Sequence, residues 1–109
     1  MPATDFSALF ETLKKGVADL ATATLRDYVA QATTDGLNAL NTMQTDLERW
    51  TEKLASGRLT IDDVRFLMQG KKELMLMKAL QQAGLAQIRL DTFRNSLIDM
   101  VIGTMSNAL

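Results

Sequence analysis

The chain contains no cysteine and no histidine, and its single proline is Pro2. Without cysteine it forms no disulfides and has no thiolate chemistry, and without histidine it lacks the Glu-x-x-His ligands of di-iron helical bundles. Because proline stands only at the start, nothing later in the chain forces a helix to break. We therefore expect no enzyme activity, no cofactor and no metal site, and we expect long helices.

The chain also has no excess of positive or negative charge and no long hydrophobic run. The 12 basic and 13 acidic side chains give a net charge of -1, which does not favour a nucleic-acid partner. No apolar run approaches the roughly 20 residues of a membrane-spanning helix, and the start lacks the features of a signal peptide. We expect a cytoplasmic protein, with signal-independent export left open, and the sequence gives no support for binding to a membrane surface.

One turn is strongly marked, at residues 56–60. Gly57 suits the position just after a helix, and Thr60 suits the N-cap of the next, with Asp63 as an acidic partner in a capping box. The pattern predicts one helical domain over 1–109, with a helix at about 5–55 and another at about 61–106. At ~1.5 Å per residue the two arms would be roughly 70 Å long and would pair as an antiparallel hairpin.

Apolar residues recur at helical spacing on both sides of this turn. Before the turn they alternate at three and four positions, as in a coiled-coil seam, and after it a stripe continues from Ile61 to Met105. These stripes should hold the hairpin together, and the residues expected in its core are Leu40, Leu47, Trp50, Leu54, Phe93, Leu97 and Val101.

The middle of the first arm has few large apolar residues, because residues 21–39 are rich in alanine and threonine. Gly36 suits the end of one helix, and Asp35 suits the cap of another. A break near 33–36 therefore stays open as an alternative to one long helix. Such a break would turn the first arm back as part of a three-helix bundle.

The chain has more apolar residues than one hairpin can bury. Residues 74–77 are apolar at four successive positions, and residues 97–105 are apolar on several sides of the helix. A two-helix hairpin covers only one stripe per helix, so a second contact is expected. The simplest partner is another copy, in a two-fold dimer that forms an extended four-helix bundle. The predicted oligomer or partner interface is Leu74, Leu76, Met77, Ile98 and Ile102.

These patterns predict a non-enzymatic interaction or scaffold protein that self-associates, most simply as a homodimer. A different protein partner is one alternative, and an amphipathic protein that binds lipid or a hydrophobic granule is another. In size and layout the chain resembles the small secreted helical hairpins that carry a Trp-x-Gly turn, although Trp50 lies within the helix, seven residues before Gly57. That resemblance implies a further alternative, a hairpin cargo or partner of a secretion system.

Overall fold

A computed structural model describes residues 5–108, and within that range the chain is helical with no strand. The prediction of an all-α protein is confirmed. The α-helices are α1 (Phe6–Thr24), α2 (Val29–Thr42), α3 (Gln44–Ala55), α4 (Ile61–Gln69), α5 (Lys78–Gln82) and α6 (Gln87–Ala108). Two 3-10 turns, η1 (Arg26–Tyr28) and η2 (Lys72–Leu74), lie between helices.

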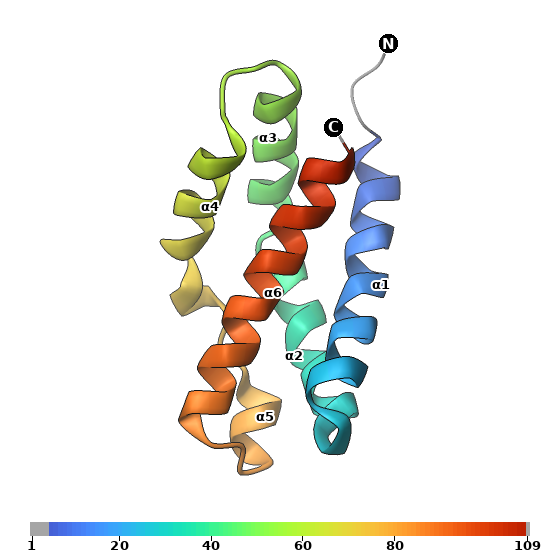
Figure 1. Ribbon diagram of the computed structural model, residues 1–109, viewed down its shortest axis with the longest axis vertical. Coiled ribbons are helices and arrows are strands. Elements are labelled where there is room, and N and C mark those ends of the chain that lie inside the picture. The colour runs from blue at the N-terminus through green and yellow to red at the C-terminus, as the bar shows by residue number, and fades with distance from the viewer. Residues whose placement is uncertain (1–4, 109) are drawn as a thin grey trace.

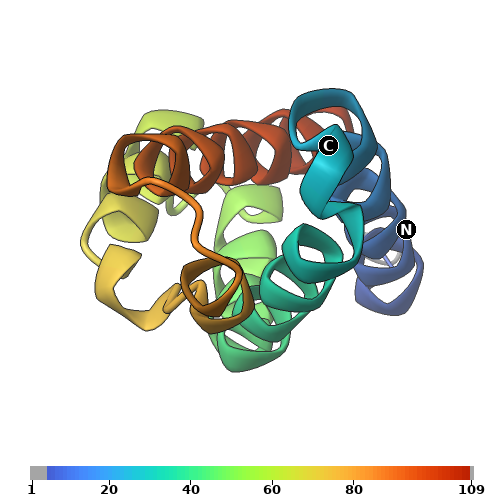
Figure 2. The same cartoon turned by 90° about the horizontal axis from the view of Figure 1, so that it is seen from below.

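Four antiparallel segments of one chain lie side by side (Figures 1 and 2). They are α1, the bent pair α2–α3, the interrupted pair α4–α5, and α6. The principal dimensions are 45 × 24 × 19 Å, so the prediction of two uninterrupted arms, each roughly 70 Å long, is wrong. Each predicted arm reverses direction once, and a four-segment arrangement thereby forms within a single chain.

The first arm reverses at residues 25–28, and not near Gly36. Leu25 leaves the helical conformation, with φ -133° and ψ 63°, and its side chain is buried. The 3-10 turn η1 follows, and α2 then runs back along α1 (Figure 1). Gly36 lies inside α2, where a Cβ atom would be 2.5 Å from Cγ1 of Val17 in α1. This glycine therefore allows the two helices to approach closely and does not end a helix.

The second arm is interrupted twice. After α4 the chain forms η2 and a short non-helical stretch before α5, and it then reverses at Gly84, whose φ is 89°. The amide of Leu85 donates to the carbonyl of Leu80 at 3.1 Å, and the Leu85 side chain is buried beneath this turn. A glycine in the left-handed region followed by a buried apolar residue is a common helix ending. From here α6 runs back to the end of the molecule at which α1 begins (Figure 1).

Turn 56–60 joins α3 to α4 with the predicted capping chemistry. Gly57 has φ 79°, the amide of Asp63 donates to the Thr60 hydroxyl at 3.1 Å, and the amide of Thr60 donates to the Asp63 carboxylate at 2.9 Å. The two bonds satisfy amides at the start of α4 that the helix itself leaves unpaired.

We expect Thr60→Ala to lower the free energy of unfolding by about 1 kcal/mol, because the cap hydroxyl is lost. Urea denaturation followed by circular dichroism measures the change. Thr22→Ala is the matched control, since Thr22 is exposed within α1 and its hydroxyl bonds only to the carbonyl of Ala18. Equal loss in both variants would contradict a capping role for Thr60.

Candidate interaction surface

The predicted hairpin core lies in the interior of the fold. Leu40, Leu47 and Trp50 on α2 and α3 are buried, and so are Phe93, Leu97 and Val101 on α6. Leu54 is half-buried and packs against the same cluster. Side chains of α1, α4 and α5 complete this cluster, so the core belongs to four segments and not to two arms alone.

The predicted second contact surface is divided by the fold. Leu74 and Leu76 are exposed, with 42% and 54% of their surface accessible, whereas Met77, Ile98 and Ile102 are buried. For these three the assignment to an outer interface is wrong. Because α6 packs against α1 and α4, the apolar residues on several of its sides are covered within the chain. The apolar side chains that one hairpin could not bury are therefore mostly buried within a single molecule.

The four successive apolar residues at 74–77 are not part of an α-helix, since they lie between α4 and α5. Met75 and Met77 are buried while Leu74 and Leu76 face outward, so the side chains of this non-helical stretch alternate between the interior and the surface. Met77 has φ 53° and ψ 40° and is the one non-glycine residue between 5 and 108 with positive φ. That left-handed conformation costs roughly 1–2 kcal/mol for a residue with a Cβ atom, so packing must hold it in place.

Two further large apolar side chains are exposed, Phe66 at 78% and Ile88 at 75%. Neither residue is among the five of the predicted interface, although Ile88 lies off the main apolar stripe in the sequence. The helical spacing of the sequence is consistent with an exposed Phe66. Val64 and Met68 are buried, and position 66 is turned about 200° from both around the helix. An aromatic residue opposite the buried stripe of its own helix is available for an external contact.

Asp35 fixes α5 to α2. Its side chain is only 4% exposed, and it accepts hydrogen bonds from the amides of Ala79 at 3.0 Å and Leu80 at 2.8 Å. These amides belong to the first turn of α5, where they have no acceptor within the helix and where a negative charge is favoured. The sequence suggests Asp35 as the cap of a helix that follows it directly; Asp35 does cap a helix, but one that begins more than forty positions later.

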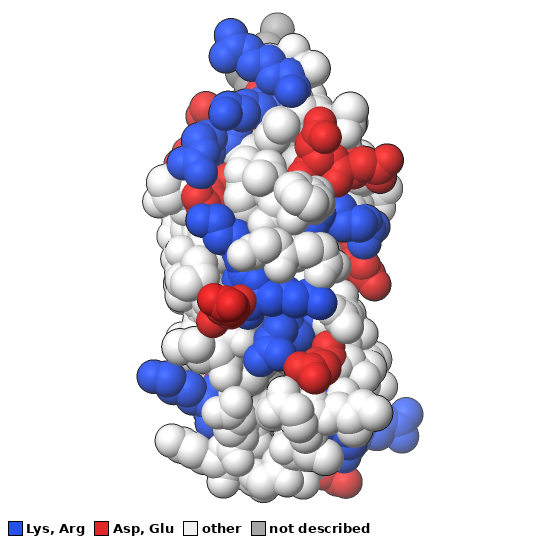
Figure 3. All heavy atoms as spheres, turned by 90° about the vertical axis from the view of Figure 1, so that its left-hand side faces the viewer, with Lys and Arg blue, Asp and Glu red and all other residues white. Residues whose placement is uncertain are grey.

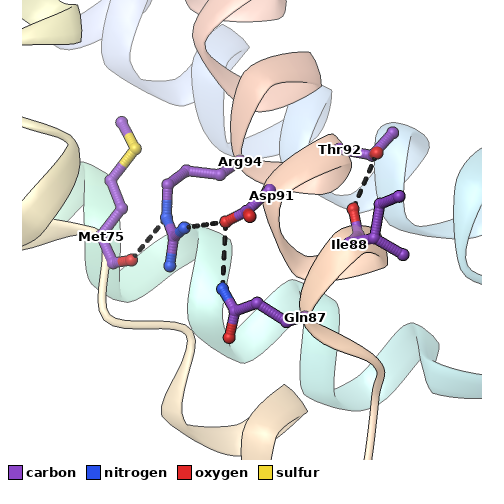
Figure 4. Close-up of polar contacts among 6 residues, drawn as sticks. All are labelled: Met75, Gln87, Ile88, Asp91, Thr92 and Arg94. Atoms are coloured by element: carbon purple, nitrogen blue, oxygen red, sulfur yellow. Dashed lines mark hydrogen bonds and ion pairs between the residues drawn. The ribbon is translucent and has the colours of Figure 1, made fainter.

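Two cationic side chains fix the segment before α5. Lys71 Nζ lies 3.3 Å from the carboxylate of Asp46 on α3. On α6, Arg94 Nε donates to the carbonyl oxygen of Met75 at 3.0 Å, and its Nη1 lies 2.8 Å from Asp91 (Figure 4). Gln87 donates to the same Asp91 oxygen at 3.1 Å and so holds the pair in place (Figure 4). The exposed leucines therefore lie on a segment tied to α2, α3 and α6.

A shallow groove runs beside the exposed leucines. It has a volume of about 180 Å³, and it is lined by Asn38, Ala39 and Thr42 with Asp35 on α2, and by residues 74 and 76–78 on the other side. On the side of the molecule that carries α4 and α5, basic and acidic side chains are interspersed around uncharged surface (Figure 3). One of the ion pairs joins Arg65 of α4 to Asp99 of α6 at 2.6 Å. The surface on this side is thus mixed in charge.

None of the helices between residues 5 and 108 combines the length and the apolar character needed to cross a bilayer. In that same range no group of three or more Asp or Glu side chains is placed to hold a metal ion. The fold defines a class, a small all-α protein with four antiparallel segments in one chain. No protein-family model, curated protein sequence or solved structure matches the chain.

Proposed function

We propose that this chain is a non-catalytic helical interaction protein that associates with a second copy of itself. The contact surface is the α4–α5 surface, which we define as Phe66 on α4 with Leu74 and Leu76 before α5. The observation that carries the proposal is the exposure of Leu74 and Leu76 on a segment that Asp35, Lys71 and Arg94 hold in place, together with the exposure of Phe66 on α4. A contact surface that is already ordered loses little conformational entropy when it binds.

Two features favour a second copy as the partner. The side of the molecule bearing α4 carries both signs of charge, so two identical surfaces can meet without the repulsion that a single-sign face would produce (Figure 3). The whole chain has 12 basic and 13 acidic side chains, so long-range repulsion between copies is small. Closed two-fold dimers are also the commonest assemblies of identical chains.

The test is the mass in solution, measured by size-exclusion chromatography with light scattering over a concentration series. We expect the mass to rise to twice that of the chain, and the double variant Phe66→Asp, Leu76→Asp to remain monomeric. Both side chains are exposed, so the variant should keep its helicity by circular dichroism. A substitution at Ile98, by contrast, would damage the core, because this residue is buried.

Ala18→Asp is the matched control, since Ala18 lies on an exposed position of α1 away from the α4–α5 surface. It adds the same kind of charge and should leave the dimer intact. A monomeric wild-type mass at every concentration would overturn the proposal. So would flotation of the monomer with neutral phosphatidylcholine vesicles, because the apolar residues would then serve a lipid surface.

A further inference from the structure

A small pocket lies between the end of α1 and the first half of α6. In Figure 4, Thr92 lies on the side of α6 opposite Arg94, and the pocket is on the Thr92 side. The pocket has a volume of about 130 Å³ and is lined by Thr24, Leu25, Arg89, Thr92, Phe93 and Ser96. It shares no residue with the α4–α5 surface, so a ligand bound here is a separate property from the dimer proposed above.

The floor of the pocket is apolar. Leu25 and Phe93 are buried, with 3% and 2% of their surface accessible. Thr24, Arg89 and Thr92 are exposed and form the rim. An apolar cavity of about 150 Å³ holds one benzene molecule, so a planar group of about that size can enter this pocket with its polar edge at the rim.

Arg89 places a positive charge at the rim, and none of the ion pairs among residues 5–108 includes it. Its guanidinium lies 5.9 Å from the centre of the Tyr28 ring, a distance at which an aromatic face attracts a cation. Arg89 is also the third residue of α6, where the positive end of the helix dipole favours an anion. The opposing partial charge at the end of α1, beside Thr24, is only about half a unit, so the full charge of Arg89 outweighs it.

The hydroxyl groups of the pocket limit the kind of anion that fits. Thr24 and Thr92 each donate to a carbonyl four residues earlier, at 2.7 and 2.9 Å, so their hydrogens are already engaged. The donors left for a ligand are the guanidinium of Arg89 and the hydroxyl of the half-buried Ser96. These two groups suit a carboxylate, which a guanidinium binds through two parallel hydrogen bonds. They are too few for a phosphate group, which carries three acceptor oxygens and a larger charge.

We propose that this α1–α6 pocket binds a small organic acid, a monocarboxylate whose apolar body is about the size of one aromatic ring. The carboxylate pairs with Arg89 and accepts a hydrogen bond from Ser96, while the ring lies against Leu25 and Phe93. Because the Tyr28 ring already holds the guanidinium at the rim, binding orders few additional groups.

Benzoate is the probe for this site, and benzamide is its neutral counterpart of the same shape. Each is titrated at constant ionic strength into isotope-labelled wild-type protein, and the amide chemical shifts are followed by NMR. We expect saturable shifts at residues 24–25 and 89–96. Benzamide should bind at least about tenfold more weakly than benzoate, because a hydrogen bond to a charged group contributes at least that factor.

Two variants separate the charge from the cavity. Arg89→Gln should weaken benzoate about tenfold and leave benzamide unchanged, because the guanidinium is lost while the floor stays intact. Arg58→Gln is the matched control, since Arg58 is exposed in turn 56–60, and it should change neither affinity. Ser96→Leu should fill the pocket and abolish binding of both probes, with helicity retained by circular dichroism.

Equal affinity of the wild-type protein for benzoate and benzamide would overturn the proposal, because the charge would then have no role. Unchanged benzoate affinity in Arg89→Gln would overturn it as well. Shifts that rise linearly with benzoate and never saturate would show that the pocket is not a binding site.

Discussion

Replacing Asp35 with alanine is expected to lower the free energy of unfolding by about 2–4 kcal/mol, because two amides in the first turn of α5 lose their acceptor. The amide of Leu80 is in a buried environment, where bulk solvent does not reach it to replace the carboxylate oxygen. A buried donor left unpaired costs more than the net value of the hydrogen bond it made. The favourable position of a negative charge at the start of a helix is lost at the same time.

Urea denaturation with the linear extrapolation method measures this loss. Asp19→Ala is the matched control, since it removes the same charge from an exposed position on α1 and should change stability by less than about 0.5 kcal/mol. Asp35→Asn keeps one acceptor oxygen and should fall between the two. If Asp35→Ala were as stable as Asp19→Ala, the carboxylate would not be what holds α5 in place.

The local features of the fold could be predicted from the sequence. Turn 56–60 was found because its signals are short-range: Gly57 takes a positive φ, and Thr60 and Asp63 bond to each other across three positions. Most residues assigned to the core are indeed buried, because a stripe at helical spacing reports burial whichever segment covers it.

The reversals of the chain could not be predicted in the same way. At Leu25 neither glycine nor proline marks the turn, and the residue leaves the helix to bury its side chain against the core. At Met77 the left-handed conformation contradicts the local propensity and is held by partners far along the chain, among them Asp35 and Arg94. Tertiary contacts override weak local preferences at both places.

The candidate surface was predicted only in part for a related reason. The apolar excess at residues 74–77 was evident, but its division into buried Met75 and Met77 and exposed Leu74 and Leu76 depends on the non-helical backbone there. The same excess in α6 was assigned to a partner molecule, whereas α1 and α4 of the same chain cover it. Counting apolar residues shows that a second contact exists, and the chain reversals decide whether it lies within or between molecules.

Gly36→Ala is expected to destabilise the protein by about 1–2 kcal/mol, although alanine is the better helix former by roughly 1 kcal/mol. The added Cβ atom would lie 2.5 Å from Cγ1 of Val17, which is fully buried. A β-branched side chain in a helix has one strongly preferred rotamer and cannot turn aside, so α1 and α2 must move apart. The crowding therefore outweighs the gain in helix propensity.

Two other glycines of the chain separate crowding from propensity. At Gly16 a Cβ atom would meet Sδ of Met100 at 2.6 Å, but methionine has three rotatable bonds and can shift, so Gly16→Ala should be close to neutral. At Gly103, exposed on α6, a Cβ atom meets nothing within 4 Å, and Gly103→Ala should stabilise by about 0.5–1 kcal/mol. Thermal and urea denaturation of the three variants should rank them Gly103→Ala, Gly16→Ala, Gly36→Ala. A stabilising effect at Gly36 would mean that α1 and α2 are not in close contact there, since only that contact opposes the intrinsic preference for alanine.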